Sequence, residues 1–254
     1  MSAQGRFAYA QARLQARLGD SVTPDMTEQM HAARDLAGLL AVVRTTSLRR
    51  YASRLAPGLD PHELERHLRG EWIALVDEIA RWQPGEWRAA VRWLRWLPSL
   101  PLLQKLARGG RPAAWARNDP WLGRVVAVEP ALRAAELART PLGPLRAAFE
   151  QDEHDTLAAW LAHWRALWPR DREAAIALEA IVRDVAASGA ALREPAVRDS
   201  RDAQRALQRR LLRTFRRHPS SVAAAVAFIG LEGLAMLTLR GSVLRRAVVD
   251  PGPA

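Results

Sequence analysis

The sequence predicts an all-α protein folded as a multi-helix bundle, and three observations point to this class. Apolar residues recur at spacings of three and four throughout the 254 residues, whereas the alternating Val, Ile and Thr runs typical of strands are absent. Hydrophobic residues make up 49% of the chain, which is normal for a globular protein and argues against disorder. Between the apolar segments, proline repeatedly follows Asp or Thr, a pairing typical of helix starts.

The expected helices of the amino-terminal part follow from their caps and breaks. Residues 6–18 form a first helix that ends in glycine, and residues 24–43 form a second one capped by Thr23. A capping box at residues 60–63, with proline at the first helical position, starts a third helix that continues to about Trp82. Prolines then cut the following stretch into shorter helical pieces, at positions 84, 98 and 101.

The carboxy-terminal part shows the same punctuation. Residues 109–112, Gly-Gly-Arg-Pro, form the clearest linker in the chain. Further helices are expected to start at Asp119-Pro120, Thr140-Pro141 and Trp168-Pro169. The helix after Pro169 is expected to end at Ser188-Gly189, and the next one follows Glu194-Pro195 and runs through Arg217.

These elements predict three parts of the chain. We expect a helical lobe over residues 1–108, a second lobe over residues 109–195, and long helices over residues 196–254 that pack back on the first helix. A weak internal repeat, in which residues 82–91 resemble residues 168–176, suggests two or three related helical lobes that together form a funnel. The alternative is that proline followed by Ala-Ala is simply common at helix starts.

The last long segment is the most informative one. Pro219 suits the first turn of a helix, and the 18 residues 222–239 that follow contain a single ionisable side chain, Glu232. A helix that is apolar on nearly every face is buried either in a bundle or in lipid, and this length is close to a membrane span. We favour a central bundle helix in which Arg13 or Arg17 of the first helix neutralises the carboxylate, because a buried charge needs a partner.

The same segment resembles the carboxy-terminal signature of the C/d subunit family of V/A-type rotary ATPases, which includes the d subunit of the eukaryotic V-type enzymes. In that signature a proline-led helix carries aromatic and apolar residues, an acidic pair and a Leu-Arg near its end. The matching residues here are Pro219, Phe228-Ile229, Glu232 and Leu239-Arg240. Ala235 stands where the second acid is usual, and Thr238 stands where an amide is common.

The amino terminus carries a second part of the resemblance. Tyr9, Arg13 and Arg17 lie in a segment that is similar to the opening Tyr-x-x-Ala-Arg helix of the same family. The resemblance covers both ends of the chain and the middle only by helical pattern, and the chain is shorter than is usual for the family.

The resemblance implies a non-catalytic connector without a cofactor. Such a protein sits on the cytoplasmic face of a membrane rotor ring, receives the base of the central stalk and transmits torque between the two during ATP-driven or ion-driven rotation. The implied partners are the ring and stalk subunits, and the implied location is peripheral on the inner face of the membrane. No signal peptide is visible at the start of the sequence, which also favours the cytoplasm.

Charge points to an acidic partner of some kind. The net charge is +11, and 38 residues are Lys or Arg. Nucleic acid, an anionic membrane surface and an acidic protein would all be attracted, and the charge does not choose among them. The densest basic run near the end of one helix exceeds what the helix dipole needs and is a candidate partner-binding face. It consists of Arg209, Arg210, Arg213, Arg216 and Arg217.

Ten tryptophans form a second pattern. Trp160, Trp164 and Trp168 are spaced by four and predict a stripe buried in the core. The alternative is a surface that binds a partner or stacks on bases, since several tryptophans are interleaved with arginine. Trp115 and Trp121 flank the linker and are the two expected to be exposed.

Nothing in the sequence indicates an enzyme. There is no cysteine, and no pair of the six histidines, at positions 31, 62, 67, 154, 163 and 218, has the spacing of two metal ligands on one helix face. Phosphate-binding loops and nucleophile elbows are missing as well. The rival functions are therefore a basic helical protein that associates with nucleic acid, an adaptor of another membrane assembly, and a helical enzyme whose site is assembled from distant residues.

Overall fold

The computed structural model describes residues 3–56, 60–150, 155–191 and 200–249, and all regular elements in these ranges are helices. The predicted all-α bundle is thereby confirmed. The longer helices are α1 (Ala3–Gly19), α5 (Pro61–Trp82), α11 (Thr156–Ala166), α12 (Arg172–Ala191), α13 (Ser200–Arg217) and α14 (Val222–Val249). The shorter ones are α2 (Pro24–Ala32), α3 (Leu36–Arg44), α4 (Arg49–Ala52), α6 (Arg88–Trp93), α7 (Leu100–Ala107), α8 (Leu122–Val126), α9 (Arg133–Ala138) and α10 (Ala147–Glu150).

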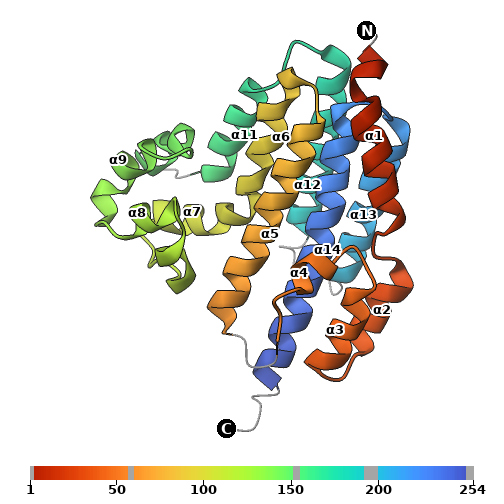
Figure 1. Cartoon of the computed structure of the whole chain (residues 1–254). Helices are drawn as coiled ribbons and strands as arrows, with labels where there is room; N and C mark the ends of the chain where they lie inside the picture. Colours follow the sequence, from red (N-terminus) through yellow and green to blue (C-terminus); the bar gives the residue numbers. More distant parts are fainter. Residues whose placement is uncertain (1–2, 57–59, 151–154, 192–199, 250–254) are drawn as a thin grey trace.

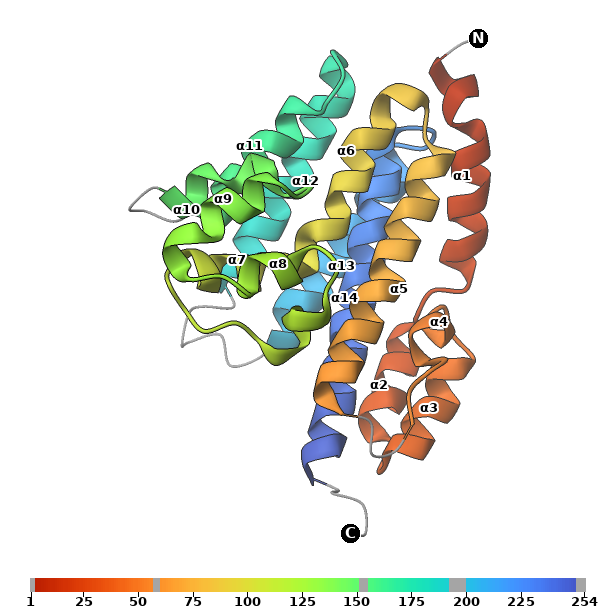
Figure 2. The ribbon, with the colours of Figure 1, turned by 60° about the vertical axis from the view of Figure 1, so that its left-hand side comes forward.

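Helix α14 is the centre of the bundle. It contacts α13, α1, α12, α5, α3 and α2, so both halves of the chain meet on it (Figures 1 and 2). Its 28 residues correspond to a length of about 40 Å. In the described part of the chain it is the one helix long and apolar enough to cross a membrane, but 61% of its most apolar window is buried inside the protein's own fold. Such burial is typical of a core helix.

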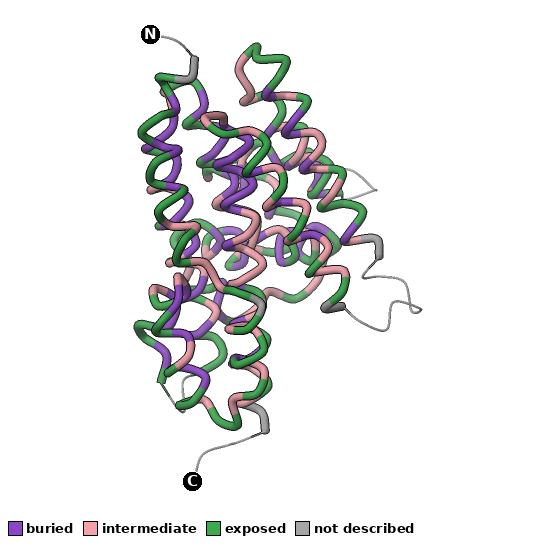
Figure 3. The backbone as a smooth tube through the Cα atoms, turned by 90° about the vertical axis from the view of Figure 1, so that its right-hand side faces the viewer, coloured by how far each residue is buried: buried purple, intermediate pink, exposed green. Residues whose placement is uncertain are grey.

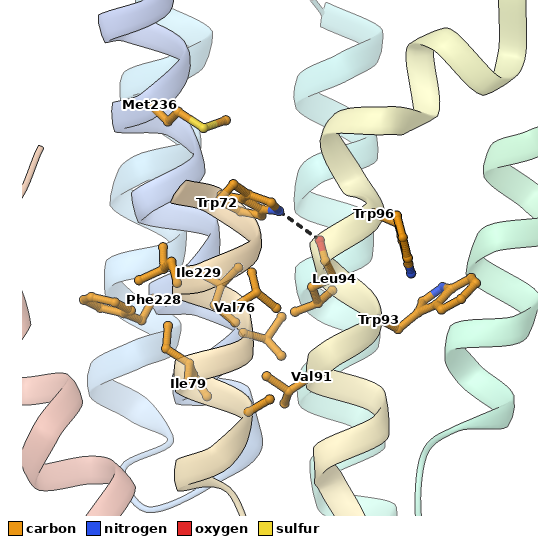
Figure 4. Packing of buried hydrophobic residues seen from close by; sticks show 14 of the residues in the cluster. Trp72, Val76, Ile79, Val91, Trp93, Leu94, Trp96, Phe228, Ile229 and Met236 are labelled. Carbon is orange, nitrogen blue, oxygen red and sulfur yellow. Dashed lines mark hydrogen bonds between the residues drawn. The ribbon is translucent and has the colours of Figure 1, made fainter. Parts of the chain in front are cut away.

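The core continues from α14 through α5 to α6. Phe228, Ile229 and Met236 of α14 belong to one buried hydrophobic cluster with Trp72, Val76 and Ile79 of α5 (Figure 4). The indole N–H of Trp72 donates to the Leu94 carbonyl oxygen at 3.2 Å. Gly233 brings α14 close to α5, since a Cβ at this position would lie 3.3 Å from the Trp72 ring. Buried residues line the inward faces of the long helices and exposed ones their outer faces (Figure 3).

Tryptophan packing joins α6 to α11. The rings of Trp160 and Trp164 have centroids 5.5 Å apart, and Trp168 meets Trp164 edge-on at 5.0 Å. The indole N–H of Trp164 donates to the Ala90 carbonyl oxygen at 2.9 Å, and that of Trp93 donates to the Trp160 carbonyl oxygen at 3.3 Å. The prediction that this stripe is core is confirmed for Trp160 and Trp164, which are buried, while Trp168 is half-buried.

A group of short helices, α7 to α10, projects from one side of the bundle (Figure 1). Polar contacts of Arg133 and Gln104 hold this group together and connect it to α11. The guanidinium of Arg133 donates to the carbonyl oxygens of Leu106 at 3.0 Å and Gly110 at 3.2 Å. The side-chain oxygen of Gln104 accepts from the backbone and hydroxyl of Thr156, which connects α7 to the start of α11.

Several expected helix boundaries are wrong. The helix expected over residues 24–43 is two helices, because the Asp35 carboxylate accepts from Gly38 N–H at 2.7 Å and starts α3 anew. Helix α12 was expected to start at Trp168-Pro169 but begins at Arg172, because the Asp171 carboxylate caps it by accepting from Ala174 N–H. This helix also does not stop at Ser188-Gly189 but runs to Ala191.

Two further starts also differ. Thr140 Oγ1 accepts from Leu142 N–H in a turn, and the α-helix after it begins only at Ala147. Pro219 lies in the turn before α14, which begins at Val222. The expected start at Glu194-Pro195 lies outside the described residues.

Candidate functional site

The first and last helices pack against each other near the start of α14. Helix α1 contacts α14, and the Gln11 side-chain oxygen of α1 accepts from the backbone N–H of Ser220 at 3.1 Å. Ser220 has a φ of 55°, a left-handed conformation that is uncommon outside glycine. The amide of Gln11 thus holds the turn that leads into α14, and the two segments that carry the family resemblance meet in space.

Glu232 is buried in the middle of α14, with 3% of its surface exposed. Burial raises the pKa of its carboxyl above the ordinary value, and the nearby groups Ser47, Arg50 and Arg17 only partly offset this effect. Ser47 Oγ lies close enough to favour the charged form, yet the pair does not have the geometry of an ordinary hydrogen bond. The site can therefore hold a proton at a higher pH than an exposed glutamate.

The prediction that Arg13 or Arg17 pairs directly with Glu232 is wrong. Arg17 directs its guanidinium to Glu78 on α5 at 2.6 Å and attracts Glu232 only from a distance. Arg13 takes no part, because its guanidinium lies over the rings of Tyr9 and Trp82, 5.2 Å from each centroid. The spacing of residues in the sequence could not show that α5 supplies a competing carboxylate closer to α1.

A polar cluster surrounds the buried carboxylate. Tyr51 of α4 is fully buried, and its pKa is raised by that burial and by the charge of Glu232. Buried atoms without a hydrogen-bond partner here are Arg17 Nη1, Ser47 Oγ, Arg50 Nε and Tyr51 Oη. Ion pairs lie at the edge of this cluster: Arg50 is 3.7 Å from Glu71 and 3.6 Å from Glu78, both on α5. The cluster thus adds polar and charged groups to the apolar packing that joins α1, α4, α5 and α14.

The other residues that carry the resemblance lie partly in the core and partly at the surface. Phe228 packs on Phe215 of α13, and Leu239 is fully buried. Arg240 reaches across to α5, where its Nε donates to Glu65 at 2.7 Å. Tyr9 is 60% exposed on the outer face of α1, so it is available to a partner.

Four of the five arginines expected to form the partner-binding face border a groove between α12 and α13 of about 670 Å³, whereas Arg209 is exposed and does not line it. Its lining includes the small residues Ala177, Ala180 and Thr214. Arg210, Arg213, Arg216, Arg217 and His218 line it as well. Sequence reasoning found this side of the groove but missed the α12 side, which only the pairing of the two helices brings there.

Of the two tryptophans expected at the surface, Trp115 and Trp121, only the second is exposed. Trp115 is buried, which corrects the prediction, because Arg69 of α5 lies over its ring at 3.9 Å and covers it. Trp121 is 38% exposed. Eight of the ten tryptophans are buried in total, so they do not form a surface for stacking on bases.

The histidines of the described chain have separate surroundings. His67 Nε2 bonds the Tyr51 carbonyl oxygen at 2.7 Å, and His163 lies edge-on to Trp93, where burial lowers its pKa. Within the described residues, no three His, Asp or Glu side chains gather in a way that could hold a metal ion. His154 lies outside these residues.

Comparison of the chain with protein-family models, with curated proteins and with solved structures gave no match. A functional proposal therefore depends on the residues and on their arrangement.

Proposed function

We propose that the protein is a non-catalytic connector of a V/A-type rotary ATPase, which links the membrane rotor ring to the central stalk and transmits torque between them. In this role it binds peripherally to the cytoplasmic face of the membrane complex and uses no cofactor. Ring and stalk subunits are its partners.

The observation that carries the proposal is the meeting of the two terminal segments. Residues that resemble the family lie more than 200 positions apart in the sequence, yet α1 and α14 are in contact, with the Gln11–Ser220 hydrogen bond between them. Glu232, at the place of the family's acidic residue, is buried where α14 faces Arg17 and Arg50.

The construction of the bundle suits the transmission of torque. The central helix α14 is surrounded by long helices, and close-packed interiors of this kind deform little under load. Polar contacts between distant segments, such as Arg240 with Glu65, add cross-links between α14 and α5. A connector needs this stiffness together with surfaces for two partners.

The rival function, association with nucleic acid, has less support than the sequence suggested. Its motivation was the net charge and the interleaved tryptophans and arginines. Most of these tryptophans are buried, and Trp115 is covered by an arginine rather than presented to a base. What remains is the positive charge alone, which attracts any polyanion.

Deleting the gene in its source organism tests the proposal. We expect membranes that still hydrolyse ATP but no longer take up ions in response, since torque cannot pass without the connector. A plasmid copy of the wild-type gene should restore uptake. Unchanged ATP-driven ion uptake after deletion would contradict the proposal.

A further inference from the structure

The groove between α12 and α13 has an imbalance of charge that the fold itself does not use. Arg210, Arg213, Arg216 and Arg217 face a single lining acid, Asp184, which lies 3.5 Å from Arg210. The other three arginines are exposed, and no described carboxylate lies within ion-pair distance of them. Cations near the end of α13 complement its dipole, but that effect needs only the last turn. The positive charge that neither Asp184 nor the helix dipole offsets indicates an anionic ligand.

The groove also has a shape. Ala177 is buried and Arg213, Arg216 and Arg217 are exposed, so the alanine lies at the bottom and the arginines at the rim. Small residues between two helices allow the backbone of a third element to approach closely, as in helix packing by ridges and grooves. A flat lipid surface would contact the rim but could not fill the groove.

The spacing of the arginines selects the kind of ligand. Arg210, Arg213 and Arg217 follow one another at three and four residues, so they form a stripe about 10 Å long on one side of α13. Acidic residues placed three and four positions apart on a partner helix would form a stripe of matching length and opposite charge. Bases would need aromatic side chains on which to stack; the lining has no Trp, Tyr or Phe, and its one aromatic ring is the imidazole of His218.

We propose that the α12–α13 groove binds an acidic α-helical segment of a protein partner, which lies as a third helix against α12 and α13. Its carboxylates pair with Arg213, Arg216 and Arg217, and its small or apolar face lies over Ala177 and Ala180. This interaction goes beyond the connector role and does not depend on it.

A titration by fluorescence anisotropy tests the proposal. The probe is a labelled alanine-rich peptide of about 20 residues, long enough to be helical in water, with glutamate every three or four positions. The comparison is a peptide of the same length with glutamate at the same positions, in which prolines replace some of the alanines and prevent the helix. We expect the helical peptide to bind at least about tenfold more tightly at physiological salt, because the helix is already ordered.

Charge reversal supplies the matched variants. R213E/R217E should weaken binding of the helical peptide by about 10- to 100-fold, because like charges then oppose each other. The same variant should gain affinity for a peptide with lysine in place of glutamate. R44E/R111E is the control: it reverses two exposed arginines elsewhere, one of them also in a last helical turn, and should change affinity less than about twofold. Circular dichroism checks folding, and R213Q/R217Q replaces the reversal if that variant does not fold.

Three outcomes would overturn the proposal. Equal binding of the two acidic peptides would show that only charge matters. Equal weakening by R213E/R217E and R44E/R111E would remove the groove from the interaction. Displacement of the bound peptide by a short DNA duplex or by anionic vesicles at lower concentration would assign the surface to nucleic acid or lipid instead. None of these results bears on ATP-driven ion uptake, so the two proposals fail separately.

Discussion

Replacing Trp164 by Ala is expected to lower the free energy of unfolding by about 3–5 kcal/mol, the range for truncating a large buried aromatic residue. The ring is buried between Trp160 and Trp168, and its N–H satisfies the Ala90 carbonyl of α6. Truncation therefore opens a cavity where α6 and α11 pack together, a contact that we call the α6–α11 seam, and it removes the hydrogen bond to the Ala90 carbonyl. Denaturant unfolding followed by circular dichroism measures the change, since fluorescence would report the lost tryptophan itself.

Two variants separate packing from the hydrogen bond. Trp164→Phe keeps most of the volume and should cost less than Trp164→Ala, with the lost hydrogen bond contributing about 1 kcal/mol. Trp121→Ala, at a partly exposed tryptophan, should cost less than about 1 kcal/mol. If Trp121→Ala destabilises as much as Trp164→Ala, the α6–α11 seam is not a principal part of the core.

Placing a cation at the centre of α14 should have an effect of similar size. We expect Glu232→Lys to lower the free energy of unfolding by about 3–5 kcal/mol, because it buries an unpaired charge beside Arg17 and Arg50. Thermal and denaturant unfolding measure this change. Stability equal to that of the wild type would show that the site is open to water and that α14 is not central to the fold.

The neutral variant Glu232→Gln gives a prediction about pH. The pKa of the buried carboxyl is raised, so the folded protein holds this proton more tightly than the unfolded chain. Below the ordinary pKa of about 4.5 the wild type and the variant should be similar. As pH rises through the folded pKa, the wild type should lose stability relative to Glu232→Gln, and above it the difference should stay constant. A wild type that gains on the variant as pH rises would show that an arginine pairs directly with Glu232.

Local signals predicted the fold well wherever caps and periodicity agreed. The capping box at Asp60 and the apolar periodicity after it locate α5 because both depend only on neighbours in sequence. The break between α2 and α3 was missed because Asp35 can be a surface residue or a cap, and only the packing of two short helices decides. Gly189 predicted a helix end, but a helix interior tolerates glycine when its neighbours hold the turn.

The candidate site was less predictable, because its contacts join distant segments. The buried position of Glu232 follows from its apolar surroundings in sequence. Its neighbours Ser47 and Tyr51 lie on a short helix and turn whose place against α14 no sequence spacing reveals. Trp115 was expected at the surface because it lies near a linker, yet Arg69 covers it from α5.

The measurement that tests the connector role most directly is affinity purification of the tagged protein from gently solubilised membranes of its own source, after nuclease treatment, with mass spectrometry of what accompanies it. The tag alone is the control. The account predicts rotor-ring and central-stalk subunits of a rotary ATPase in amounts comparable to the protein itself. Recovery of an unrelated complex, with ring and stalk subunits at the level of the control, would contradict it.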